Sequence, residues 1–313
     1  MPAGTLVILN PMGRSGAIGR RFAPIEAKLR AALGPFEVER TRGPRDAERI
    51  AREAVRAGVE RLVVAGGDGT LSEVVTGLLA ADLGAYARIA PLPLGTGGDL
   101  LRTFGVPRDL DAALARIAGG KTRRIDVGRA RFRALDGRDR TTYFLNVASF
   151  GVSGLVTQLV NEAPKALGGR ASFLIGTLRG LARYRVPYVT VRVDGAPFFD
   201  GPLTLATAAN CRYFGGGMLV APQASPDDGL LDVVVVSGLS KPALVRRLPL
   251  LYRGTHFDAP GVVHTRGRVV EAELGASREA GPIFTEIDGE PLGTLPVRYE
   301  ALPAAITLLG VDS

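Results

Sequence analysis

The chain has 313 residues, of which 46% are hydrophobic and 22% charged, and this length and composition are typical of a globular protein with two domains. One cysteine and two histidines exclude an internal disulfide, a cysteine-rich zinc site and most histidine-based catalysis. The net charge of +8 indicates an anionic partner, and because aromatic-basic RNA motifs, zinc-finger spacing and long basic helices are absent, a nucleotide or an acidic membrane surface is favoured over nucleic acid.

Up to about residue 127, short apolar runs alternate with amphipathic segments. This alternation predicts an α/β domain in which helices cover a parallel sheet. The expected elements are strand 6–9, helix 17–33, strand 36–39, helix 46–57, strand 62–65, a helix from residue 70, and a helix at 109–118 that Asp109 caps and Gly119 ends.

From residue 124 the pattern changes to an alternation of apolar and polar residues with a period of two. This pattern predicts an antiparallel all-β domain, a sandwich or a barrel, and we take the sandwich as the expected form. Two arginine-rich amphipathic helices are expected within it, at 171–186 and 240–253. The expected strands are 125–133, 143–149, 188–193, 203–208, 231–236 and 268–274.

Three glycines surround one aspartate directly after the strand at 62–65, in the sequence AGGDGT. Glycines 66, 67 and 69 let backbone N–H groups approach an anion, and the following helix adds the positive end of its dipole. A carboxylate would repel phosphate unless a cation lay between them, so Asp68 predicts Mg²⁺ binding or proton transfer. The segment predicts a nucleotide site, with a tight turn and an incidental aspartate as the alternative.

A second glycine-rich turn with an aspartate, GTGGD at 95–99, follows the next expected strand. Loops at the carboxyl ends of neighbouring parallel strands converge on one crevice, so we expect both turns to face a single ligand. The expected phosphate donors are the N–H groups of 66–72, the Thr96 hydroxyl and the loop 10–16, and the expected metal-binding charges are Asp68, Asp99 and Asp126, the last of which also fits a plain strand-edge position.

Two other nucleotide-binding motifs fail on inspection. Residues 115–122 (ARIAGGKT) nearly match the Walker A pattern, but Ala115 replaces its first glycine and the segment ends a helix instead of joining a strand to one. Glycines 13, 16 and 19, after the first strand, do not have the Rossmann spacing. The sequence therefore disfavours a P-loop ATPase and a hydride-transfer enzyme.

Together with NPMGRSG at 10–16, the two turns make the sequence resemble the diacylglycerol kinase-like lipid kinases, which include bacterial diacylglycerol kinases and the sphingosine and ceramide kinases. The resemblance covers nearly the whole chain. Its other parts are YFLNVASFG at 143–151, the segment 215–236 and Asp-Gly-Glu at 288–290. Two positions depart from the family pattern, because Ser72 and Gly98 stand where the family usually has Asn.

The resemblance implies a nucleotide-binding catalytic domain at 1–127, completed by 295–313, and a lipid-substrate domain at 128–294. It implies a lipid kinase that uses ATP and Mg²⁺ to phosphorylate a membrane lipid, with diacylglycerol expected first and ceramide or a sphingoid base second. NAD kinase, an enzyme of a different class that also uses a Gly-Gly-Asp-Gly loop, is an alternative function. The non-enzymatic alternative is a regulatory protein that binds nucleotide or lipid but catalyses no reaction.

The resemblance also implies roles for individual residues. Glu290 would accept the proton of the lipid hydroxyl, and Asp68 is its rival for that role. A structural Mg²⁺ would lie at Asp228 and the carbonyls of Ser225 and Leu230, where a metal-free Asx turn is the alternative. The implied nucleotide-binding residues are Asn10, Pro11, Ser15, Gly16, Thr41, Gly66, Gly67, Asp68, Gly69, Thr70, Leu71, Ser72, Thr96 and Asp99.

A lipid substrate requires access to a bilayer surface. No apolar run approaches the roughly 18 residues of a membrane span, and we find no secretory signal or lipidation motif. We therefore expect a cytoplasmic protein that associates peripherally with the inner face of the membrane. Arg179, Arg183, Arg246 and Arg247 are the expected contacts with anionic lipid, unless they are merely solvated behind packed apolar faces. A homodimer is one of the assemblies that the sequence leaves open.

Overall fold

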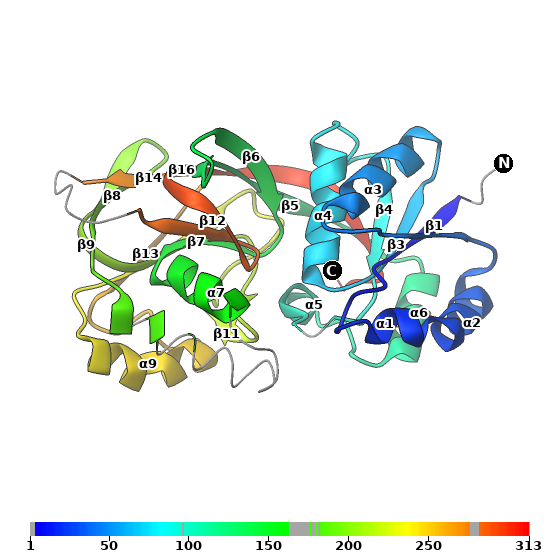
Figure 1. Ribbon diagram of the computed structural model, residues 1–313, viewed down its shortest axis with the longest axis horizontal. Helices are drawn as coiled ribbons and strands as arrows, with labels where there is room; N and C mark the ends of the chain where they lie inside the picture. The colour runs from blue at the N-terminus through cyan, green and yellow to red at the C-terminus, as the bar shows by residue number, and fades with distance from the viewer. Residues whose placement is uncertain are drawn as a thin grey trace. The chain divides into compact units, whose positions relative to one another are not determined.

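The computed structural model describes residues 4–95, 97–162, 176, 179–180, 182–275 and 282–312. Contacts divide the chain into two compact units, of which unit 1 is Met1–Val127 with Pro303–Ser313 and unit 2 is Gly128–Leu302 (Figure 1). Residues 295–302, which we expected in the first domain, lie in unit 2. The reason is that Val297 to Glu300 pair with a strand of unit 2.

The sheet of unit 1 is parallel, in the order β4-β3-β1-β2. The C-terminal end of the long strand β16 (Glu290–Leu309) adds a further parallel strand beside β4. Three of the first four strands are almost wholly buried, as in a sheet that is covered on both faces. The first four strands are β1 (Thr5–Leu9), β2 (Glu37–Arg40), β3 (Arg61–Ala65) and β4 (Arg88–Pro91).

Helices cover both faces of this sheet, so the expected α/β fold is confirmed (Figure 1). Gly77 permits close packing of α3 on α4, because a Cβ atom there would meet the carbonyl oxygen of Glu48. Asp109 caps α6 as predicted, accepting a hydrogen bond from the Ala112 amide at 2.9 Å. The helices are α1 (Ala17–Arg20) and α2 (Phe22–Leu33), expected as one, α3 (Asp46–Arg56), α4 (Asp68–Leu79), the short α5 (Asp99–Thr103) and α6 (Leu110–Ala118).

Six antiparallel strands of unit 2 close into a barrel, in the order β16-β14-β8-β9-β7-β15 and back to β16. The all-β prediction is confirmed, but the expected sandwich is a closed barrel in this structure. Closure is possible because the long strands β9 and β16 each pair with different neighbours along their length. The barrel strands besides β16 are β7 (Val147–Gly151), β8 (Tyr188–Val193), β9 (Ala196–Ala209), β14 (Val269–Leu274) and β15 (Phe284–Ile287).

The remaining elements of unit 2 extend or cover the barrel. Strands β12 (Leu231–Ser237) and β13 (Val262–Gly267) continue the sheet from β9, and β5 (Thr122–Ala134) forms a hairpin with β6 (Asp139–Phe144). The short strands β10 (Tyr213–Phe214) and β11 (Met218–Leu219) pair with each other. The described helices are α7 (Val152–Glu162) and α9 (Lys241–Arg253).

Half of the helix expected at 171–186, including the apolar residues 173–175, lies outside the described residues. None of the helices that the structure describes is long and apolar enough to cross a bilayer.

Candidate active site

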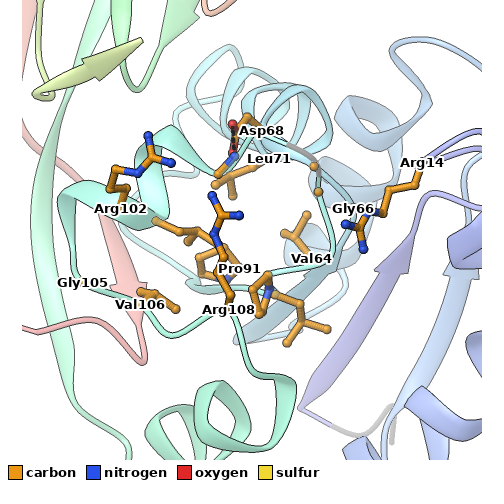
Figure 2. A pocket seen from close by; sticks show the side chains of 17 residues that line it. Arg14, Val64, Gly66, Asp68, Leu71, Pro91, Arg102, Gly105, Val106 and Arg108 are labelled. Atoms are coloured by element: carbon orange, nitrogen blue, oxygen red, sulfur yellow. Dashed lines mark hydrogen bonds between the residues drawn. The ribbon is translucent and has the colours of Figure 1, made fainter. Parts of the chain in front are cut away.

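Loops at the carboxyl ends of the parallel strands carry most of the predicted site residues. Asn10 follows β1, Thr41 follows β2, Gly66 follows β3 and Leu92 follows β4. A cavity of about 330 Å³ opens here, which is large enough for part of a nucleotide. Both glycine-rich turns line it, so they lie close enough together to face a single ligand (Figure 2). The lining residues include Gly66, Gly67, Asp68, Leu71, Gly95, Gly97 and Gly98.

Asp68 joins the two turns. It is the first residue of α4, two residues earlier than we expected, and its Oδ2 atom accepts hydrogen bonds from the amides of Gly98 (2.9 Å) and Asp99 (3.3 Å). Burial raises the pKa of the Asp68 carboxyl, while these amides and the charge of Arg102 act in the opposite direction. Oδ1 accepts no hydrogen bond within the described part of the chain, so this oxygen is available to a cation.

Close backbone contact between the turns explains their glycines. A Cβ atom on Gly95 would lie 2.7 Å from the Cα atom of Gly67, and one on Gly97 would lie 2.9 Å from Oδ2 of Asp68. A Cβ atom on Gly66 would lie 2.5 Å from the Thr70 hydroxyl oxygen. A larger side chain at Gly95 or Gly97 would separate the two loops, and one at Gly66 would displace Thr70, so the glycines fix the shape of the cavity.

The loop after β1 is tied to the same site. The Asn10 side-chain amide donates a hydrogen bond to the Thr70 hydroxyl at 2.9 Å, and the Pro11 carbonyl accepts one from Gly19 at 3.2 Å. Ser15 and Gly16 have φ of 56° and 82°, and the preceding residue, Arg14, has φ of 51°. Two successive non-glycine residues in the left-handed region are strained, and such strain concentrates at functional sites.

Three arginines line the cavity, of which Arg14 belongs to the loop 10–16 that was expected to donate to phosphate, whereas Arg102 and Arg108 had no expected role. Figure 2 shows Arg14 and Arg102 on opposite sides of the opening, Arg108 between them and Asp68 facing the space they enclose. Arg102 also donates to Asp99 Oδ1 at 3.1 Å. Guanidinium groups on several sides of a cavity suit the oxygen atoms of a polyphosphate. In the sequence, Arg102 and Arg108 are distinguished only by following the second glycine-rich turn.

The other predicted site residues of unit 1 are mostly buried within the domain. Thr41, Leu71 and Asp99 are buried, Ser72 is half-buried within α4, and Thr96 lies outside the described residues. Asp126 is buried and its Oδ1 atom accepts a hydrogen bond from the Ala304 amide at 2.7 Å. This bond ties β5 to the last part of β16, so Asp126 has a role in the fold of unit 1.

Glu290 lies at the exposed end of a tight hairpin in unit 2. Asp288 and Gly289 have φ of 48° and 89°, as a two-residue type I′ turn between paired strands requires. The Asp288 carboxylate accepts hydrogen bonds from three consecutive backbone amides, those of 145–147, at 2.8 to 3.2 Å. The turn is thus rigidly held while the Glu290 side chain remains exposed.

A second carboxyl behind this turn, Glu286, was missed by the sequence analysis. It is 5% exposed and accepts hydrogen bonds from the Gly289 amide and the Ser149 hydroxyl, both at 2.8 Å. Burial raises its pKa to about 7, assisted by the neighbouring charges of Asp288 and Glu290. Its burial depends on strand and helix partners far away in the sequence, so no local pattern reveals it.

The turn at 225–230 differs from the implied metal site. Asp228 Oδ1 accepts a hydrogen bond from the Leu230 amide at 3.0 Å, which makes an Asx turn, and its Oδ2 lies 3.4 Å from a nitrogen of Arg266. The guanidinium already supplies a positive charge to this carboxylate, so the arrangement fits a metal ion poorly. Within the described residues there is also no group of three or more His, Cys, Asp or Glu side chains that could hold a metal ion.

Comparisons with known proteins give a consistent result. Residues 4–130 match the diacylglycerol kinase catalytic domain, and residues 146–310 match the YegS C-terminal NAD kinase beta sandwich-like domain. A protein of Mycobacterium tuberculosis (strain CDC 1551 / Oshkosh) named "Diacylglycerol kinase" is 31% identical over 304 residues, 96% of this chain and 93% of that protein. A protein of Pseudomonas aeruginosa (strain UCBPP-PA14) named "Probable lipid kinase YegS-like" is 37% identical over 265 residues, 83% and 80% of the two chains.

Solved structures agree on the fold. A diacylglycerol kinase of Bacillus anthracis strain Sterne matches with a TM-score of 0.70 and 22% identity, over 98% of this chain and 96% of that one. Yeast NADH kinase in complex with NADH matches with a TM-score of 0.54 and 12% identity, over 100% and 84%. At these identities the two structural matches support the architecture alone.

Proposed function

This chain belongs to the diacylglycerol kinase-related family of lipid kinases, and on that basis we propose that it transfers the γ-phosphate of ATP to diacylglycerol and so forms phosphatidic acid. Relatives that carry the name diacylglycerol kinase, at 31% and 27% identity over more than nine tenths of the chain, favour this acceptor. The observation that carries the phosphoryl-transfer chemistry is the cavity that combines three arginines with Asp68 at the start of α4.

In this proposal the triphosphate of ATP occupies the cavity. The first N–H groups of α4 point away from the helix and carry its positive partial charge, which attracts phosphate oxygens. The guanidinium groups of Arg14, Arg102 and Arg108 hold those oxygens and neutralise the charge that moves onto the leaving ADP. The hydrogen bond from Asn10 to Thr70 holds the loop after β1 against the start of α4, next to the phosphates.

We propose Asp68, with its Oδ1 atom, as the main protein ligand of a nucleotide-bound Mg²⁺, and Asp99 as a nearby supporting charge. When bound, this ion would reduce the negative charge of the phosphates and favour attack by the lipid hydroxyl. A structural Mg²⁺ at Ser225, Asp228 and Leu230 stays a prediction, and the contact between Asp228 and Arg266 argues against it.

The lipid hydroxyl oxygen forms the new bond to the γ-phosphorus, the bond from that phosphorus to ADP breaks, and the hydroxyl proton must leave. We assign Glu290 as its acceptor because its carboxylate is exposed on a turn that backbone hydrogen bonds hold rigid. An ordinary carboxylate suffices because, in a loose transition state, the proton moves late.

A panel of acceptors tests the substrate. The protein is incubated with radiolabelled ATP, Mg²⁺ and mixed micelles that contain diacylglycerol, ceramide or sphingosine, and separately with NAD, and Asp68→Asn gives the background. We expect label in phosphatidic acid at the highest rate. Faster transfer to ceramide or sphingosine would replace diacylglycerol as the substrate, and transfer to NAD alone, or to nothing, would overturn the proposal.

We also propose that α9 is the part of unit 2 that contacts an anionic membrane on its inner face. Its apolar residues Leu244 and Leu251 pack against buried clusters of unit 2, while Val245 and Tyr252 remain 40% and 52% exposed. Pro249 is exposed between them, at a spacing that places all three on one helix face. Exposed apolar and arginine side chains on one helix are typical of attachment to an anionic bilayer surface.

The arginines of α9 differ in their freedom to bind lipid. Arg246 and Arg253 are exposed, whereas Arg247 donates a hydrogen bond to the Pro260 carbonyl at 2.6 Å. We therefore replace the expected pair Arg246 and Arg247 by Arg246 and Arg253. Arg179 and Arg183 belong to a stretch that the structure describes only in part.

A further inference from the structure

The turn that carries Glu290 has a buried acid directly behind it. Glu286 lies on β15 between β7 and β16, opposite Ser149 on β7. Its Oε1 atom accepts a hydrogen bond from the Gly289 amide, inside the turn, and its Oε2 atom accepts one from the Ser149 hydroxyl. The Ser149 oxygen lies 2.8 Å from the hydroxyl oxygen of Ser153, at the start of α7. These contacts form a chain from the turn to a buried pair of hydroxyls.

The surroundings of Glu286 disfavour its negative charge. It takes part in none of the ion pairs found among the described residues, and burial raises its pKa to about 7. The titratable groups around it are acidic: Asp288 and Glu290 on the turn, and Tyr299 on β16, whose hydroxyl bonds to Thr285 at 2.6 Å. From β7 it meets the neutral hydroxyl of Ser149, which in turn bonds to the neutral hydroxyl of Ser153 on α7.

The contacts accommodate both protonation states of Glu286. As a carboxylate it accepts from Gly289 and from Ser149. As a carboxylic acid it keeps the bond from Gly289 and donates its proton to the Ser149 oxygen, which can then donate to Ser153. The geometry of the turn therefore survives a change of one charge on Glu286.

We propose that Glu286 is a positioning residue for phosphoryl transfer, which holds the Gly289 amide so that the turn presents Glu290 and, by its own ionisation, strengthens Glu290 as a proton acceptor. The electrostatic coupling is reciprocal: Glu290 raises the pKa of Glu286, so an ionised Glu286 must favour a proton on Glu290. The proposal rests on the role of Glu290 in the proposed function.

The first test measures the titration of Glu286 directly, without the phosphoryl-transfer reaction. In ¹⁵N-labelled full-length protein, the Gly289 amide resonance should shift with a midpoint near pH 7, because its acceptor changes charge. The shift should vanish in Glu286→Gln, while Gly137, whose amide bonds to the Ala134 carbonyl, serves as a reference that does not move in either protein. A Gly289 resonance that stays constant from about pH 5.5 to 8.5, or that titrates equally in Glu286→Gln, would overturn the proposal.

The second test measures kcat and the KM for ATP across the same pH range in wild type, Glu286→Gln and Glu286→Ala. As the pH increases, wild-type kcat should rise in a step near pH 7, and Glu286→Gln should lack this step. Any effect of the titration of ATP itself should be the same for all the proteins. Glu286→Ala should lower kcat about tenfold at low pH and by more above pH 7, and Glu286→Gln should restore it at low pH, where the native residue is neutral. The KM for ATP should stay unchanged in both.

Controls separate this inference from the proposed function. Glu271→Gln, at a partly exposed glutamate paired with Arg298, should reproduce the wild-type profile. Wild-type kcat in Glu290→Gln would remove Glu290 as the acceptor and so defeat the proposed proton transfer, whereas the Gly289 titration would still report on Glu286. A pH step that persists in Glu286→Gln would defeat the inference and leave the lipid kinase reaction untouched.

Discussion

The Oδ2 atom of Asp68 lies 2.9 Å from the backbone nitrogen of Gly98 and accepts its hydrogen bond. This bond joins the first turn of α4 to the turn that leads into α5, so one side chain closes the contact between the two glycine-rich loops and also contributes charge to the cavity. The structural and chemical roles of Asp68 use different properties, its acceptor oxygen and its charge, and a substitution can separate them.

Asp68→Asn should lower phosphoryl transfer at least about a hundredfold, because the charge that faces the cation is lost. The asparagine oxygen can still accept from Gly98, and burial already disfavours the aspartate charge, so the melting temperature should not fall. Transfer is measured with labelled ATP and diacylglycerol, and stability by thermal unfolding. Asp111→Asn, at an exposed residue paired with Lys28, is the matched control. Undiminished transfer in Asp68→Asn would remove Asp68 from the mechanism.

Gly95→Ala should weaken ATP binding, because its Cβ atom would lie 2.7 Å from the Gly67 Cα atom and would force the two loops apart. We expect a KM for ATP raised about tenfold and a loss of unfolding free energy of about 1–3 kcal/mol. Gly43→Ala, where a Cβ atom meets nothing within 4 Å, should change neither quantity. Equal behaviour of the two variants in nucleotide titration would show that the close contact does not shape the site.

Gly98→Asn tests one of the departures from the family pattern. Gly98 has φ of 68° and ψ of 33°, in the left-handed region that Asn tolerates, and a Cβ atom there meets nothing within 4 Å. Gly98→Asn should therefore retain activity and cost less than about 1 kcal/mol, whereas Gly98→Val should cost about 1–3 kcal/mol because a β-branched residue is strained at this φ. Thermal unfolding of both variants measures the difference, and equal losses would contradict it.

The fold and much of the candidate site of unit 1 could be predicted because short sequence patterns indicate them. The alternation of apolar runs and amphipathic helices predicts a parallel sheet, and glycines beside Asp68 and Asp99 mark the ends of two strands that such a sheet brings together. By contrast, Arg102 and Arg108 cannot be told from the other basic residues, 39 in all, by any local pattern. An arginine becomes a phosphate ligand only through the position of its loop.

Unit 2 was less predictable because its arrangement depends on distant pairings. Alternation with a period of two identifies strands, but barrel closure requires β16 to pair with both β14 and β15, and no single segment encodes this. Glu286 looks like a polar residue of an alternating strand until β7 and α7 cover it. Asp288 likewise gains its role from amides more than 140 residues away.

Glu286 should make the stability of the protein depend on pH. Its pKa rises from 4.5 in the unfolded chain to about 7 in the fold, so the stability that protonation supplies is complete below about pH 4.5 and is lost as the pH rises through 7. The difference in unfolding free energy between wild type and Glu286→Gln should therefore change by on the order of 3 kcal/mol across this window, with the wild type losing more. Urea unfolding at a series of pH values measures it, and a constant difference would contradict the assigned burial.

The exposed face of α9 predicts how the protein binds vesicles. Arg246 and Arg253 flank Val245 and Tyr252, so adsorption should combine attraction to anionic lipid with shallow burial of apolar side chains. At about 1 kcal/mol for each arginine near the surface, Arg246→Glu with Arg253→Glu should weaken binding at least about thirtyfold. Co-sedimentation with anionic and zwitterionic vesicles measures this.

Binding to anionic vesicles should also fall steeply as salt is raised, because the surface potential is screened over a Debye length of about 8 Å at physiological ionic strength. The matched control is Arg138→Glu with Arg140→Glu, on the exposed β5–β6 hairpin of the same unit, which changes the net charge by the same amount at a different place. This control should bind almost as well as wild type, because only charges within a Debye length of the lipid contribute to the attraction. If both double variants lose binding equally, the net charge of the protein and not the α9 face attracts it to the membrane. If the protein binds zwitterionic vesicles as well as anionic ones, electrostatic attraction does not hold it at the membrane.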